Sequence, residues 1–340
     1  MNLENRLKTL DYKCEVCGAH TFYQFDYPTD PGPRKNQMLK SEIRRYFANS
    51  AKWIIRHLLF WDTTDATLLG LKKRSSNTFN KVKSPRKLAR ALRNVNKGLE
   101  LFEGKKIIIC SVCDMGTTYP KISEEALVKF YSQDYWVAES GDLETCENNR
   151  TTSTYKLLKE QLNFSDLKTV LEFGSASAQL SRYIQIHEKG LVFDCVDPGI
   201  VWQEKLKPFI RNIYLDIRKI NEKYDMVCGS HSLEHVPDIA DYFSLFVNLL
   251  NPRGYLYFEI PNSVEKERIF GEEPDYHFPH TYFYTPKSFE KLAEKFGLEI
   301  IFTKTFSQSY TERFAGENKH IDSTIEHPDG AYLRVLLRKK

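Results

Sequence analysis

The sequence has no long hydrophobic run. Its longest apolar cluster, from Trp53 to Trp61, is interrupted by Arg56 and His57, whereas a membrane-spanning helix needs about 20 consecutive apolar residues. The first residues, Met-Asn-Leu-Glu-Asn-Arg, also lack the apolar segment of a secretory signal peptide. We therefore expect a soluble, cytoplasmic protein.

Internal repeats and low-complexity tracts are absent as well. Hydrophobic residues make up 41% of the chain and aromatic residues 13%, which is enough for a packed core and excludes global disorder. A length of 340 residues suits two domains better than one.

The sequence carries little net charge, only +4, but its basic residues are concentrated between Pro31 and Lys106. That segment holds 19 Lys and Arg against 5 Asp and Glu. Apolar residues at helical spacing predict a basic helical hairpin over about 31–105. Two interpretations stay open: a solvated cationic face, or a surface that binds a nucleotide-sugar diphosphate, an acidic glycan, nucleic acid or an anionic membrane surface.

Cysteine is sparse, with seven in the chain, yet four of the seven form two Cys-x-x-Cys pairs: Cys14 with Cys17, and Cys110 with Cys113. Two such pairs supply the four thiolates of a closed, structural metal site. We predict zinc there, although iron suits the same ligands. Two unrelated reduced pairs are the alternative. The three other cysteines are expected to be small core residues: Cys146, Cys195 and Cys228.

The C-terminal half alternates strand-like and helix-like segments, which predicts an α/β domain with a mostly parallel sheet. Seven strands are expected near 168–173, 191–196, 212–215, 224–229, 254–260, 299–305 and 331–338. Helices are expected at 178–188, 238–250 and 286–296. The predicted organisation is a metal-binding module over 1–120, a helical linker over 121–166 and the α/β domain over 167–340.

Acidic residues follow several of these predicted strands. Glu172 precedes the small-residue turn Phe-Gly-Ser-Ala-Ser-Ala, Asp197 ends Val-Asp, and Asp216 ends Tyr-Leu-Asp. The carboxyl ends of parallel strands form the ligand edge of an open α/β sheet. Acids repeated in register there predict a site for a nucleoside-type cofactor.

Five segments together resemble the class I S-adenosylmethionine-dependent methyltransferases: Leu-Glu-Phe-Gly at 171–174, Val-Asp-Pro at 196–198, Tyr-Asp-Met-Val at 224–227, Leu-Glu-His-Val at 233–236 and Leu-Asn-Pro-Arg-Gly-Tyr at 250–255. The similarity is strongest to the sugar and small-molecule branch, in which a zinc-knuckle pair precedes a segment like Phe-Tyr-Ser-Gln-Asp-Tyr at 130–135. It also includes His-Thr-Tyr-Phe-Tyr-Thr-Pro at 280–286. The resemblance implies a Rossmann-like sheet of seven strands and S-adenosylmethionine as cofactor.

Within this resemblance, Glu172 is expected to pair with the methionine ammonium of the cofactor, Asp197 to accept the ribose hydroxyls and Asp216 to receive the adenine amino group. The predicted cofactor-binding residues are Glu172, Gly174, Ser175, Asp197, Asp216 and Ser230. The turn departs from the family in having Ala176 and Ala178 where glycines are usual. An alanine is unfavourable there if the backbone needs a positive φ.

The predicted catalytic residues are His280, His235, His231 and Tyr282, with His277 in the same rim. A histidine can take the proton of a hydroxyl acceptor, although His235 as a plain helix cap is an equal alternative. The resemblance implies methyl transfer to a small polar or saccharide acceptor, a nucleotide-sugar or a glycan. We expect a hydroxyl to receive the methyl group, with an amine or a carbon as the alternatives. The alternatives are a nucleic-acid methyltransferase that uses the basic insert and a non-catalytic adaptor. A nucleic-acid role is disfavoured because the sequence has no Asn/Asp-Pro-Pro-Tyr/Phe segment.

Overall fold

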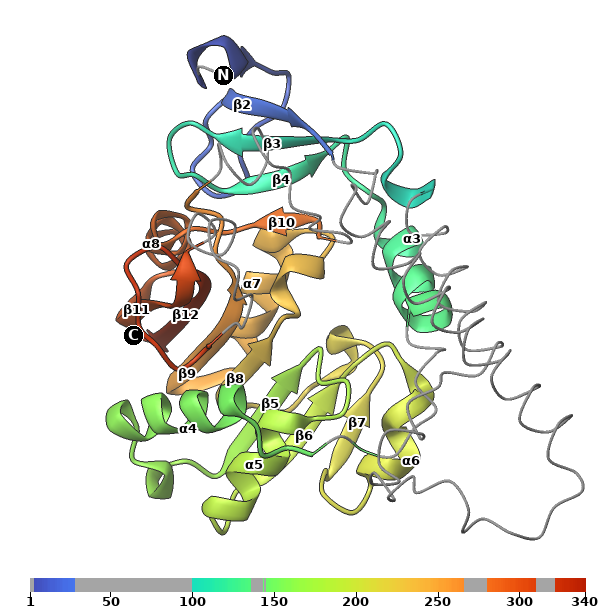
Figure 1. Cartoon of the computed structure of the whole chain (residues 1–340). Coiled ribbons are helices and arrows are strands. Elements are labelled where there is room, and N and C mark those ends of the chain that lie inside the picture. Colours follow the sequence, from blue (N-terminus) through green and yellow to red (C-terminus); the bar gives the residue numbers. More distant parts are fainter. Residues whose placement is uncertain (1–2, 28–99, 136–142, 144, 266–279, 310–321) are drawn as a thin grey trace, which may run out of the picture.

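The computed structural model of the chain describes residues 3–27, 100–135, 143, 145–265, 280–309 and 322–340 (Figure 1). The basic helical hairpin expected over 31–105 lies almost wholly outside these residues, and so does His277. Among the helices that the structure describes, none has the length and apolarity needed to cross a membrane.

A seven-stranded mixed sheet forms the larger part of the molecule, as the sequence predicts. Its spatial order is β11-β12-β9-β8-β5-β6-β7. The five strands from β9 to β7 are parallel, while β12 pairs antiparallel with both β9 and β11. The strand bounds are β5 Thr169–Phe173, β6 Val192–Val196, β7 Asn212–Tyr214, β8 Tyr224–Ser230, β9 Leu250–Pro261, β11 Leu298–Ser309 and β12 Gly330–Lys339.

Helices cover both faces of this sheet, which explains why successive residues of its central strands are buried on both faces. Val170 and Leu171 are adjacent on β5, are both fully buried, and point into opposite cores. The core on the side of Leu171 includes residues of α7 (Ile239–Leu249) and α8 (Pro286–Lys295). The other core includes residues of α4 (Asn149–Gln161), α5 (Gln179–His187) and α6 (Gln203–Leu206). Cys195 and Cys228 are fully buried in this second core, and Cys146 is also buried, as predicted.

A second, five-stranded antiparallel sheet stands above the first in Figure 1 and has the order β1-β2-β3-β4-β10. Four of its strands come from the N-terminal segments: β1 Leu7–Thr9, β2 Thr21–Asp26, β3 Lys106–Cys110 and β4 Gly116–Tyr119. The fifth, β10 (Tyr282–Phe283), comes from the C-terminal half and pairs with β4. The two parts of the chain are therefore joined by backbone hydrogen bonds.

Short helices complete the connections between the two sheets and around the parallel strands. Within the described residues, the other helical elements are η1 Leu3–Arg6, α3 Glu124–Lys129, η3 Phe130–Tyr135, η5 Phe164–Asp166, η6 Ile200–Trp202, η7 Ile217–Lys219 and η8 Leu233–His235. Of these, η8 directly follows β8 and precedes α7, so it lies at the carboxyl edge of the parallel sheet.

Candidate functional site

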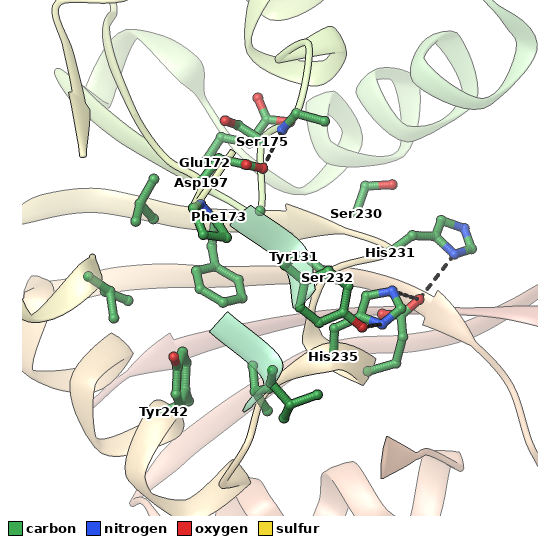
Figure 2. Close-up of a pocket in the computed structure, with 18 of the residues that line it drawn as sticks. Tyr131, Glu172, Phe173, Ser175, Asp197, Ser230, His231, Ser232, His235 and Tyr242 are labelled. Carbon is green, nitrogen blue, oxygen red and sulfur yellow. Dashed lines mark hydrogen bonds and ion pairs between the residues drawn. The ribbon is translucent and has the colours of Figure 1, made fainter. Parts of the chain in front are cut away.

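A cavity of about 930 Å³ opens at the carboxyl ends of β5, β6 and β8 (Figure 2). Its size is that of a site for a cofactor together with a small ligand. Residues from α3, η3 and the first turn of α4 line it as well. The predicted cofactor residues and three predicted catalytic histidines all border this one cavity.

The two acids that end the central strands are buried on one side of the cavity. Glu172 is 4% exposed, and its Oε2 accepts a hydrogen bond of 3.0 Å from the backbone N–H of Ser181 in α5. Burial raises the pKa of Glu172 to about 7, although the bonds from Ser181 and the charge of Arg182 oppose the rise. Burial likewise raises the pKa of Asp197, whose oxygens accept backbone N–H bonds from Ala176 (2.9 Å) and Gly199 (2.7 Å).

Asp216, expected to receive the adenine amino group, lies at the far rim of the same cavity. It caps η7 by accepting a bond of 2.9 Å from the backbone N–H of Arg218. Its side chain is 43% exposed, so an oxygen remains accessible to a ligand.

Gly174 has a reason for being glycine that the sequence alone did not supply. Its φ is +62°, and a Cβ on it would come within 2.3 Å of the Cβ of Ser232 in the loop after β8. The sequence predicts that a cofactor approaches Gly174 closely, whereas in this structure it is the loop after β8 that does so. The neighbouring Ala176 and Ala178 have φ of 44° and 51°, so both alanines occupy the positive-φ conformation that favours glycine.

The other two predicted cofactor residues, Ser175 and Ser230, also line the cavity. The hydroxyl of Ser230 donates to Oε1 of Glu259 at 3.1 Å. Glu259 is buried and also accepts a bond of 2.6 Å from Arg334, while Arg150 lies 3.5 Å away. Burial would raise the pKa of Glu259, but Arg334, His231 and Arg150 lower it overall. Ser230 is thus tied to a buried ionic network beneath the cavity.

The opposite end of the cavity carries imidazoles around a buried carboxylate. Oε1 of Glu234 lies 3.3 Å from Nδ1 of His231, 3.9 Å from Nε2 of His235 and 4.0 Å from Nε2 of His280. Burial would raise the pKa of Glu234, but contact with His231 and the charges of His235 and His231 hold it below its usual value. In Figure 2 His231 and His235 lie on the same side of the pocket, away from Glu172 and Asp197.

Backbone contacts fix this end of the cavity. The N–H of Thr281 donates to the carbonyl of Glu234 at 2.8 Å, and its hydroxyl donates to the same carbonyl at 2.9 Å. The carbonyl of His280 accepts bonds from the hydroxyls of Tyr27 (3.0 Å) and Thr118 (3.2 Å). The N-terminal sheet therefore holds the segment that places His280.

Tyr282 lies elsewhere, and its predicted catalytic role is corrected. It is 2% exposed, and the residues that line the cavity do not include it. Its hydroxyl donates to Oε2 of Glu15 at 2.6 Å and accepts the backbone N–H of Ile239 at 3.1 Å. Because β10 alternates its side chains, Tyr282 points into the contact between the two sheets, so we assign it a structural role.

The four paired cysteines meet in the N-terminal part, as predicted. The Sγ atoms of Cys14 and Cys113 are 3.5 Å apart and those of Cys17 and Cys110 are 3.4 Å apart. All four Sγ atoms lie within 4.8 Å of one another, and all but that of Cys17 belong to buried residues. Four thiolates arranged in this way fit a tetrahedral metal ion.

Sequence reasoning missed three polar residues of the cavity region: Arg150, Glu259 and the carboxylate of Glu234. Arg150 belongs to α4, which the sequence analysis treated as a linker. A signal was present, because Asn148 and Thr151 form a capping box that starts α4 beside the cavity. Glu234 belongs to the Leu-Glu-His-Val segment, and no local pattern in the sequence indicates that three histidines lie around its carboxylate.

Residues 148–302 match the family model described as a methyltransferase domain. No curated protein matches the chain. The matched residues include the five parallel strands β5 to β9 of the seven-stranded sheet. The matched segment begins at the N-cap of α4.

Solved structures of methyltransferases are similar to this chain at low identity. An S-adenosylmethionine-dependent methyltransferase from Thermotoga maritima is 17% identical, with 56% of this chain and 89% of that chain covered and a TM-score of 0.42. One from Clostridium acetobutylicum is 14% identical, with 56% and 91% covered and a TM-score of 0.41. The N-methyltransferase NodS from Bradyrhizobium japonicum is 14% identical, with 57% and 98% covered and a TM-score of 0.38.

Proposed function

We propose that this protein transfers the methyl group of S-adenosylmethionine to a hydroxyl of a small polar or saccharide acceptor, a nucleotide-sugar or a glycan. The observation that carries the proposal is the division of one cavity into an end with buried strand-end acids and an end with histidines. Each end suits one of the two ligands that a methyl transfer brings together.

The acidic end fits the cofactor. Glu172 offers a carboxylate to its ammonium, Asp197 retains acceptor capacity for two ribose hydroxyls, and Asp216 lies where an adenine amino group can donate. When bound, the cofactor supplies an electrophilic methyl group on a sulfonium.

The histidine end fits the acceptor. A hydroxyl oxygen placed there forms the new C–O bond as the C–S bond breaks, and its proton must leave in the same region. His235 and His280 present ring nitrogens to this part of the cavity, and Glu234 supports a positive charge that develops on either ring. Positioning by the rigid sheet edge supplies the rest of the catalysis.

A screen of nucleotide-sugars and glycans tests this function. Each candidate is incubated with the protein and S-adenosylmethionine, and the products are weighed by mass spectrometry. We expect one acceptor class to gain 14 mass units per methyl group, about the mass of a CH₂ unit, at a hydroxyl. Transfer to an amine or to an oligonucleotide instead would refute the acceptor class, and cofactor binding without transfer to any acceptor would favour the adaptor alternative.

For the four-cysteine cluster we propose a structural zinc ion. Four thiolates leave no open coordination position, so this ion would hold the N-terminal sheet together and take no part in the reaction. Elemental analysis of freshly purified protein should find at least one zinc per chain. Less than half an equivalent of zinc would count against this site, and iron in its place would correct the choice of metal.

A further inference from the structure

Glu234 combines deep burial with a lack of hydrogen bonds. Its side chain is 1% exposed, and neither carboxylate oxygen has a hydrogen-bond partner among the residues that the structure describes. The nearest imidazole is that of His231, whose Nδ1 lies 3.3 Å from Oε1. A buried carboxylate left in this state is costly unless a charged partner satisfies it. The second oxygen, Oε2, is buried as well and has no hydrogen-bond partner among the described residues.

Two further imidazoles lie at the spacing of metal ligands. The Nε2 atoms of His235 and His280 are 3.9 and 4.0 Å from Oε1 of Glu234, and one ligand atom from each of the three residues lies within 4.8 Å of the others. Ligands bound at about 2.1 Å to one ion are at most about 4.2 Å apart. Both histidine–carboxylate separations satisfy that limit.

The neighbours of these ligands orient them. Nδ1 of His235 is hydrogen-bonded to the hydroxyl of Tyr131 at 2.8 Å, which directs Nε2 toward Glu234. Thr281 bonds the carbonyl of Glu234, and thereby fixes the distance between η8 and the segment of His280. Partners of this kind set the ring orientation of metal-binding histidines.

We propose that Glu234, His235 and His280 hold a divalent transition-metal ion at the acceptor end of the cavity. Two imidazoles and one carboxylate suit zinc, manganese or iron, and three protein ligands leave positions open for a ligand from the cavity. This site is separate from the four-cysteine cluster, which has no open position.

The ion would also have a catalytic role, and that role rests on the proposed methyl transfer. The acceptor hydroxyl binds an open position, and the ion lowers the pKa of that hydroxyl as a Lewis acid. The proton leaves to water, the oxygen forms a bond to the methyl carbon, and the C–S bond breaks with its electron pair going to sulfur. His235 and His280 are then ligands, and no longer need to accept the proton.

Manganese binding tests the site without reference to activity. The full-length protein is first stripped of metal and given one equivalent of zinc, which four thiolates bind in preference to two imidazoles and a carboxylate, and is then titrated with Mn²⁺ alone. The electron paramagnetic resonance signal of free aqueous Mn²⁺ reports binding. We expect one Mn²⁺ per chain, and at least about tenfold weaker binding in Glu234→Gln and in His280→Asn because each removes one of only three protein ligands.

His187→Asn is the matched control. His187 is an exposed histidine on α5 that stacks on Tyr155 and is not among the cavity residues, so its loss should leave Mn²⁺ binding unchanged. Circular dichroism and zinc content verify that each variant is folded. If Glu234→Gln fails to fold, His280→Asn and His235→Gln decide the question.

Absence of Mn²⁺ binding, or binding that survives the loss of either ligand, would overturn the site. The two proposals fail in different ways. Methyl transfer at full rate in buffers free of added metal, with no Mn²⁺ bound, would leave the proposed function standing without the ion. Binding of Mn²⁺ at Glu234, His235 and His280 without methyl transfer to any acceptor would support the metal site and refute the proposed function.

Discussion

The hydroxyl of Tyr282 donates a hydrogen bond of 2.6 Å to the carboxylate of Glu15, a residue between the two cysteines of the first Cys-x-x-Cys pair. Glu15 also forms an ion pair with Lys121, which in turn pairs with Asp238, the N-cap of α7, at 2.9 Å. A chain of polar contacts therefore runs from the cysteine cluster to the first turn of a helix that covers the parallel sheet. The sheet contact of β4 with β10 runs alongside it.

Replacing Tyr282 with Phe tests its structural role. The change removes the bond to Glu15 and leaves the buried N–H of Ile239 without its acceptor, so we expect a loss of about 1–3 kcal/mol in the free energy of unfolding. Urea unfolding followed by fluorescence measures it. The affinity for S-adenosylmethionine should stay at its wild-type value. A large loss of kcat with unchanged stability would instead restore Tyr282 to the catalytic residues.

Removal of the proposed zinc should act on the acceptor end of the cavity. The carbonyl of His280 is held by Tyr27 and Thr118 of the N-terminal sheet, whereas Glu172 and Asp197 belong to the parallel sheet. We therefore expect Cys113→Ser to lower kcat at least about tenfold, since a small displacement of a positioned group is enough. The dissociation constant of the cofactor should change little. An equal loss in cofactor affinity would show that the N-terminal sheet supports the whole cavity.

Replacing an alanine of the turn after β5 with glycine should stabilise the protein. Ala176 has a φ of 44°, and glycine relieves this strain at the expense of a larger entropy of the unfolded chain. We expect Ala176→Gly to raise the free energy of unfolding by about 0.5–1 kcal/mol. Ala240, in the first turn of α7, provides the control. Its change to Gly should lower stability by about 0.5–1 kcal/mol, because its backbone is helical. A loss of stability in both variants would contradict the strain at Ala176.

Glu172 predicts a pH dependence of cofactor binding. Burial raises its pKa in the folded protein to about 7, from 4.5, so the folded state binds the extra proton between these values. Stability from this group is therefore highest below pH 4.5 and is lost as the pH rises through 7. Pairing with an ammonium needs the ionised form, so affinity for S-adenosylmethionine should rise about tenfold from pH 6 to pH 8. Calorimetry at several pH values measures this rise, which Glu172→Gln should abolish. A rise that persists in the variant would assign it to another group.

The sequence predicts the parallel sheet well because the signals are local. Each buried strand is a short apolar run, and Glu172, Asp197 and Asp216 mark the strand ends directly. Contacts between segments far apart in the chain leave no such local signal, so the sequence does not predict them. The two-residue strand β10 joins a sheet whose other strands end at Tyr119, and no pattern within Tyr282 and Phe283 indicates a partner so distant in the chain.

Some residues of the site can likewise be predicted from local sequence, and others only from the tertiary structure. The positions of the acids follow from strand register, whereas the gathering of His231, His235 and His280 around Glu234 depends on the contact of Thr281 with η8. Tyr282 has the same residue type as a catalytic tyrosine, and only its direction across β10 separates it from the cavity. The sequence predicts a close approach to Gly174, but the neighbour that requires glycine there, Ser232, is visible only in three dimensions.

Titration of S-adenosylmethionine into the protein by calorimetry tests most directly whether the acidic end of the cavity binds the cofactor. We expect one cofactor bound per chain, with affinity reduced at least about tenfold in Asp197→Ala, because that carboxylate accepts the ribose hydroxyls. No binding of S-adenosylmethionine at about millimolar concentration, or wild-type affinity in Asp197→Ala, would contradict it.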